Sequence, residues 1–154
     1  MAALQKPVPV ILCGKGELIG RPVIAGLQPE YEVVQFIMGT DATIAEIPTI
    51  LRGQTPSSPS STLGSGDYSR RPVAVILGGG YTDVFDQVHE GVEAAFSPEG
   101  RSSGVAWLRF DPDKPMPPLG PEYAAQALHR LRDKLEALVA EGKLGNGETA
   151  VYQY

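Results

Sequence analysis

Side chains that could move a proton and hold an anion follow two of the apolar runs in this chain. Arg109, Asp111 and Lys114 follow one run, and Asp83 follows another. A carboxylate that faces a cleft can accept a proton, and arginine with lysine can hold an anionic oxygen such as a phenolate or an enolate. These residues predict proton chemistry on a bound organic molecule. The alternative is structural: Arg109 pairs with Asp111, and Asp83 caps a helix.

A glycine-rich turn after the apolar run 8–13 carries further candidates. Its glycines have the wider spacing of the dinucleotide-binding fingerprint and would contact a cofactor if one binds: Gly14, Gly16 and Gly20. Lys15 and Glu17 flank the middle glycine. The Glu17 carboxylate either occupies the positive end of the following helix, where a phosphate would bind, or faces solvent and complements the helix dipole.

The residue that would confirm a dinucleotide is missing. In nucleotide-binding relatives of this fold an acid at the end of the second strand binds the ribose. Here the second run, 31–37, ends in Met38 and Gly39. The chain also lacks a G-x-S-x-G elbow, a P-loop and a Tyr-x-x-x-Lys pair. We therefore expect no cofactor, and either proton chemistry or binding alone.

Aromatic and glycine residues complete the expected binding site. Gly79 and Gly80 would let the backbone approach a ligand closely, and Tyr81 offers an aromatic wall with a hydroxyl. Trp107, Arg109 and Asp111 alternate along a strand and should point to one side of it. Ligands of open α/β sheets bind at the carboxyl ends of the strands, which is where all of these residues fall.

The elements that must position these residues alternate between strand and helix. This order predicts one α/β domain, a three-layer Rossmann-like sandwich with about five mainly parallel strands and right-handed crossovers. The expected strands are 8–13, 31–37, 73–77, 105–110 and 149–152, and the expected helices are 17–27, 42–52, 82–96 and 122–141. Residues 53–72, rich in Ser, Pro and Gly, predict a flexible insertion that is either disordered or a lid.

Composition excludes several classes of function. The 154 residues fit one domain, and 13 basic against 18 acidic residues give a net charge of −5, which argues against nucleic-acid binding. The N-terminus shows no secretion signal and no run is long enough to span a membrane, so we expect a cytoplasmic protein. No metal-ligand spacing occurs. Cys13 is either a small buried side chain or a reactive thiol, and a homodimer is plausible.

Three segments carry a resemblance to known proteins: residues 11–20, residues 29–33 and the stretch from Trp107 to Tyr123. The last, Trp-Leu-Arg-x-Asp-x-x-Lys-Pro-x-Pro-Pro-x-Gly-Pro-x-Tyr, is the most specific. The chain resembles short fungal proteins described as NAD(P)-binding or NmrA-like, some of them in secondary-metabolite pathways. It also resembles cyclases of phenalenone biosynthesis, which close a dihydrobenzofuran by adding a hydroxyl across an alkene.

This resemblance implies a Rossmann unit converted into a cofactor-free pocket for an aromatic polyketide. A carboxylate (Glu17, Asp83 or Asp111) would move the proton, while Arg109 and Lys114 hold the charged oxygen. The expected substrate contacts are Lys15, Gly16, Gly79, Gly80, Tyr81, Trp107, Phe110 and Tyr123. The alternatives are an NAD(P)-binding module without turnover and a small NAD(P)-dependent oxidoreductase.

Overall fold

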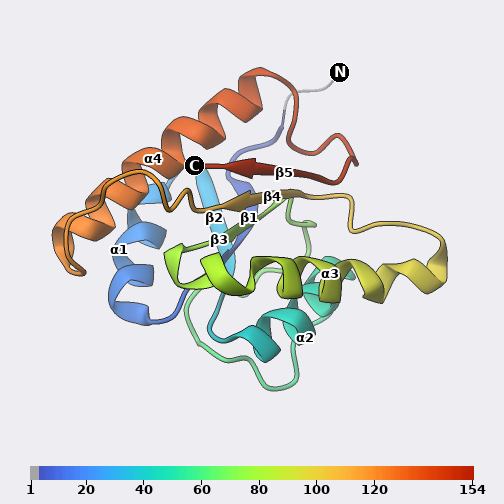
Figure 1. Ribbon diagram of the computed structural model, residues 1–154. Helices are drawn as coiled ribbons and strands as arrows, with labels where there is room; N and C mark the ends of the chain where they lie inside the picture. The colour runs from blue at the N-terminus through green and yellow to red at the C-terminus, as the bar shows by residue number, and fades with distance from the viewer. Residues whose placement is uncertain (1–3) are drawn as a thin grey trace.

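Residues 4–154 of the computed structural model form a parallel sheet between two helical layers (Figure 1). The sheet has five strands in the order β2-β1-β3-β4-β5, and every neighbouring pair is parallel. Their bounds are β1 Val8–Cys13, β2 Tyr31–Ile37, β3 Ala74–Leu77, β4 Ala106–Arg109 and β5 Ala150–Gln153. The predicted three-layer Rossmann-like α/β fold is confirmed. Residues 1–3, on which part of the expectation of no secretion signal rests, lie outside the described residues.

Helices cover both faces of the sheet. The first face, here called the α1/α4 face, carries α1 (Glu17–Leu27) and α4 (Pro121–Ala140), which pack on each other. The opposite α2/α3 face carries α2 (Thr40–Leu51) and α3 (Phe85–Phe96), with the 3-10 turns η1 (Gly79–Val84) and η2 (Ser97–Glu99) flanking α3. None of the helices within residues 4–154 is long and apolar enough to cross a bilayer.

The core is divided by the sheet into two apolar layers. Strand residues alternate between the faces, so Leu108 packs under α4 while its neighbour Trp107 packs under α3. Both strands in the middle of the sheet, β1 and β3, are buried along their whole length, as parallel strands covered on both faces require.

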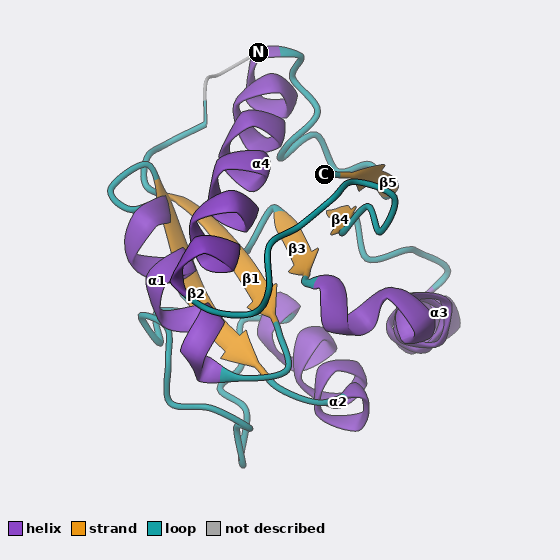
Figure 2. Cartoon of the chain, turned by 60° about the vertical axis from the view of Figure 1, so that its left-hand side comes forward, coloured by secondary structure: helices purple, strands orange, loops and turns teal. Residues whose placement is uncertain are grey.

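The last crossover has an unexpected hand. The connections from β1 to β2, β2 to β3 and β3 to β4 are right-handed (Figure 2). From β1 to β2 the chain moves toward one edge of the sheet, and from β4 to β5 it moves toward the other edge. The connecting helices α1 and α4 nevertheless lie on the same face of the sheet. The β4–α4–β5 crossover is therefore left-handed. The prediction of right-handed crossovers is therefore wrong for this unit. Its physical reason is burial, because α1 alone would leave much of that face uncovered.

The segment 53–72 runs beside the free edge of β2. Backbone hydrogen bonds join Phe36 N to Leu63 O (3.0 Å), Ser65 N to Val33 O (2.9 Å) and Gly66 N to Val34 O (2.9 Å). Side chains add to them, because Gln35 Nε2 donates to Ser61 O at 2.8 Å. The segment thereby pairs an edge that would otherwise expose backbone N–H and C=O groups. Its flexibility stays a prediction.

The strand order also defines where a ligand site belongs. Neighbours β1 and β3 are followed by elements on opposite faces, α1 on one and η1 with α3 on the other. The chain therefore diverges above their carboxyl ends, as the two connections in Figure 2 show. This is the topological switch point, the usual ligand position in open α/β sheets.

Candidate functional site

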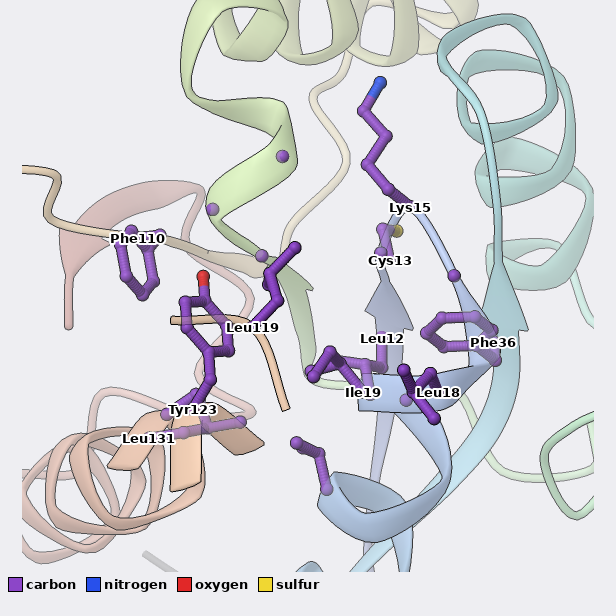
Figure 3. Close-up of a pocket in the computed structure, with 18 of the residues that line it drawn as sticks. Leu12, Cys13, Lys15, Leu18, Ile19, Phe36, Phe110, Leu119, Tyr123 and Leu131 are labelled. Atoms are coloured by element: carbon purple, nitrogen blue, oxygen red, sulfur yellow. The ribbon is translucent and has the colours of Figure 1, made fainter. Parts of the chain in front are cut away.

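A pocket of about 430 Å³ opens at this switch point, on the α1/α4 face (Figure 3). Its volume lies within the range of small-molecule sites. The wall is formed by the turn after β1, the turn after β3, the end of β4 and the first half of α4. The side chains that define it are Leu12, Ile19, Val23, Phe36, Phe110, Leu119, Tyr123, Ala127, Leu131 and Tyr154. The pocket is thus strongly apolar.

Phe36 accounts for two of the three fingerprint glycines. A Cβ at Gly20 would lie 2.7 Å from the Phe36 ring, and a Cβ at Gly14 would lie 3.0 Å from it. Only glycine lets the ring pack this closely on the turn. At the middle glycine, Gly16, a Cβ would meet nothing within 4 Å, so this position is open to a ligand. Gly14, Gly16 and Gly20 all line the pocket, as the sequence led us to expect.

Tyr123 brings a hydroxyl into the apolar wall. Its ring stacks on Phe110 with centroids 6.3 Å apart, and its Oη lies 2.8 Å from where a Cβ of Gly79 would be. No protein hydrogen bond to this hydroxyl is formed within residues 4–154. Another phenol in the wall, Tyr154, instead donates to Leu77 O at 3.0 Å. The Tyr123 hydroxyl is therefore free to bind a guest.

Lys15 stands at the edge of the pocket. Its stem passes so close to Gly80 that a Cβ there would lie 2.2 Å from Lys15 Cγ. In Figure 3 the side chain extends from the turn toward η1, away from the centre of the pocket. The ammonium nitrogen lies 5.0 Å from the centre of the Tyr81 ring. Lys15, Gly79 and Gly80 thus belong to the pocket lining, with the charge at its edge.

Tyr81 belongs to the opposite side of the sheet. It is buried on the α2/α3 face, where its hydroxyl accepts from Gly39 N and pairs with Thr43 Oγ1, both at 3.0 Å. Burial is the main reason that its pKa is raised to about 12, so the phenol stays protonated. Tyr81 connects the turn after β3 to the residues after β2 and does not line the main pocket.

The predicted proton acceptors lie outside the pocket lining. Glu17 begins α1, where it accepts from Ser61 Oγ at 2.7 Å and pairs with Arg21 at 3.1 Å. Asp83 is exposed on η1, and Asp111 Oδ1 accepts from Asp113 N at 3.0 Å. The structure therefore brings none of these carboxylates together with the pocket. Lys114 is exposed in the loop after β4 and does not line it either.

Trp107 and Arg109 share one side of β4, as predicted, but that side is the α2/α3 face. Trp107 is fully buried there and donates to Glu93 Oε2 at 3.2 Å. The Arg109 guanidinium lies over the Phe85 ring at 4.2 Å and does not pair with Asp111. Phe110, one position on, points to the α1/α4 face and lines the pocket. The alternation thus separates Phe110 from the other two.

Cys13 is fully buried, and although it is among the residues that line the pocket, its side chain packs in the apolar layer of the α2/α3 face. Desolvation raises the pKa of its thiol far above the ordinary value, and a hydrogen bond from Thr43 opposes this only in part. A thiol that stays protonated is a poor nucleophile. Of the two predicted roles, the small buried side chain fits this environment.

Several residues of the pocket wall give little or no signal in the sequence. Phe36 lies near the end of β2, where a nucleotide-binding protein would carry the acid that binds the ribose. The absence of this acid from the sequence was the one sign that the position has another role. Leu18 and Leu119 line the pocket yet are 79% and 75% exposed, and single leucines at the start of a helix and in a loop give no signal. Tyr154 packs edge-on to Phe110, from a segment far away in sequence.

Fold and pocket together define a Rossmann-like α/β protein with an apolar cavity at the switch point of its sheet. The chain is 38% identical over 143 residues to the protein named Kojic acid related protein 6 of Aspergillus oryzae. The match covers 92% of this chain and 84% of that relative. The chain belongs to the same family. No family model and no solved structure matches it.

Proposed function

We propose that this protein is a cofactor-independent cyclase of a fungal secondary-metabolite pathway. It would close a ring on an aromatic, phenalenone-type polyketide by adding a hydroxyl of the substrate to an alkene of the same molecule. The name of its relative associates that protein with kojic acid, which supports only a secondary-metabolite role. The ring closure itself comes from this chain's resemblance to polyketide cyclases. The geometry supports an apolar aromatic guest and a proton-transfer group beside it.

One observation carries the proposal: the unpartnered hydroxyl of Tyr123 projects into an otherwise apolar pocket. An apolar wall with a single convergent polar group is typical of a site that binds and orients an organic molecule. Tyrosine can act as a general acid or base when it contacts the reacting group. Phe36 and Phe110 supply aromatic walls on the two sides of the cavity.

The reaction balances without a redox partner. The attacking hydroxyl forms a C–O bond and loses its proton, while the other alkene carbon gains a proton and forms a C–H bond. Tyr123, which lines the pocket, would exchange this proton, and Lys15 at the pocket edge would stabilise negative charge on the attacking oxygen. Holding hydroxyl and alkene in contact supplies much of the acceleration that orientation gives intramolecular reactions.

The residues present do not fit a dinucleotide. β2 ends at Ile37 without the acid that would bind a ribose, and the apolar Phe36 ring lies near that position. The packing of Phe36 on Gly14 and Gly20 does not itself exclude a dinucleotide, because the middle glycine of the fingerprint, Gly16, is open. Micromolar binding of NAD(H) or NADP(H), followed by fluorescence of Trp107, would favour the non-catalytic NAD(P)-binding alternative instead.

Turnover by a Tyr123→Phe variant tests the proposal. The probe is a naphthol with an alkenyl side chain beside its hydroxyl, whose ring closure is followed by chromatography. We expect the variant to fold normally and to lose at least tenfold in rate, because it lacks only an unpaired hydroxyl. Tyr152→Phe, on β5 beneath Lys134 and Lys143, is the matched control. Equal rates for wild type and Tyr123→Phe would remove Tyr123 from the mechanism, and no turnover of any phenol would refute the cyclase.

A further inference from the structure

Within residues 4–154, Lys15 and Arg109 at the carboxyl edge of the sheet form no ion pair. Arg109, the last residue of β4, has a buried Nε without a hydrogen-bond partner. Lys15 forms neither a side-chain hydrogen bond nor an ion pair within residues 4–154. By contrast, Arg52 and Arg132 do have carboxylate partners.

Each of these cations rests on an aromatic ring of the segment after β3. The Arg109 guanidinium lies 4.2 Å from the Phe85 ring centre, and Lys15 Nζ lies 5.0 Å from that of Tyr81. Tyr81 and Phe85 are four residues apart, so the two charges flank one short stretch of chain. The rings hold the cations in place and leave their remaining donors without acceptors.

The positive edge adjoins the apolar pocket. Arg109 lines a small second hollow on the α2/α3 face together with Thr82 and Phe85. Two residues, Gly78 and Phe110, line both this hollow and the main pocket. The Arg109 side chain lies on the α2/α3 side and Phe110 on the other, so a guest against Phe110 reaches Arg109 only across the rim that the two hollows share, with Lys15 at the edge of the main pocket.

We infer that the guest of this pocket carries an oxyanion, a carboxylate or a phosphate ester, that Lys15 and Arg109 bind at the sheet edge. The inference deepens the proposed function and rests on it, since it names the chemical class of the substrate: an aromatic acid rather than a neutral aromatic. An arginine can contact a carboxylate through two parallel N–H donors, and lysine adds a point charge. Lys114 has no place in this pair because it lines neither hollow.

Binding of matched naphthalene derivatives to the full chain tests the inference. The probes are 1-naphthoate, 1-naphthyl phosphate and the neutral 1-naphthalenemethanol, titrated by calorimetry. We expect at least one anion to bind at least tenfold more tightly than the alcohol, and the arms show whether carboxylate or phosphate is preferred. The preference should shrink as salt rises, because Lys15 is exposed.

Charge variants then assign the effect. Arg109→Gln and Lys15→Met should each reduce anion affinity at least fivefold and leave alcohol affinity unchanged, whereas Arg109→Lys should keep part of the preference. The controls are Lys134→Met, a lysine over Tyr152 on the far side of α4, and Arg101→Gln, an arginine over Phe96.

The outcomes separate the two proposals. Equal affinity of wild type for the anions and the alcohol, or a preference that survives both charge variants, overturns the anion site and leaves the apolar pocket in place. If folded wild-type protein binds none of the three probes, the pocket has no aromatic guest, and the proposed function fails with the inference.

Discussion

Replacing Gly20 by alanine should expose how tightly the turn after β1 is packed on Phe36. The new Cβ would lie 2.7 Å from two atoms of a ring that is only 1% exposed. The ring must therefore move by several tenths of an ångström in a filled layer, and such overpacking typically costs about 1–3 kcal/mol. Alanine inside a helix gains about 1 kcal/mol over glycine. The net expectation is a loss of about 0–2 kcal/mol, or up to roughly 8 °C in melting temperature for a domain of this size.

A double-mutant cycle distinguishes this clash from a general intolerance of α1. Phe36→Leu shortens the side chain at the contact, so Gly20→Ala in that background should regain its helix propensity and become neutral or stabilising. The expected coupling free energy is about 1–3 kcal/mol, measured by urea unfolding of the four proteins. Additivity within about 0.5 kcal/mol would mean that the Phe36 ring does not contact the turn in this way.

Three further substitutions test other parts of the structure. Gly64→Ala should loosen segment 53–72 and speed its proteolysis, because φ at Gly64 is +114° and a Cβ there would lie 2.7 Å from Val34 O. The matched control is Gly66→Ala, where φ is +72° and a Cβ would meet nothing within 4 Å. Equal cleavage of the two variants would contradict the pairing of the segment with β2. Tyr154→Phe should lower the free energy of unfolding by about 1–3 kcal/mol, since it leaves the buried Leu77 carbonyl without its donor; an unchanged urea midpoint would exclude that bond. Arg132 donates a hydrogen bond to Glu30 at 2.8 Å and lowers the pKa of this carboxyl from its ordinary 4.5. The pair therefore stabilises the fold above pH 4.5, and this stabilisation is lost as the pH falls through the lowered pKa. Melting temperatures of wild type and Glu30→Gln should therefore converge in acid, and a constant difference from pH 6 to pH 3 would contradict the assignment.

Local patterning was enough to place most elements. The helix 17–27 and the strand 31–37 have the predicted bounds because a glycine turn, an apolar run and a proline after the helix all act within a few residues. The predicted helix 82–96 instead begins as the 3-10 turn η1 and becomes α-helical only at Phe85. Within that turn, Tyr81 is buried against Thr43, which is far away in the sequence. A local sequence pattern cannot predict such a long-range contact.

The sequence predicted the edge of the sheet at which the pocket lies, but not all of the residues that line it. Strand β4 shows the reason. Alternation along the strand fixed that Trp107 and Arg109 share one side and that Phe110 takes the other. It could not say which side faces a cavity, because that depends on where α4 lies. A right-handed crossover would have put α4 beside α3 and left the α1 face uncovered. The left-handed connection instead brings Tyr123 and Leu131 over β1 and β3, so the pocket forms on the face of Phe110. The predicted carboxylates and Arg109 do fall at the correct edge of the sheet, but none of them lines the pocket, because the hand of the last crossover places the pocket on the face opposite Arg109.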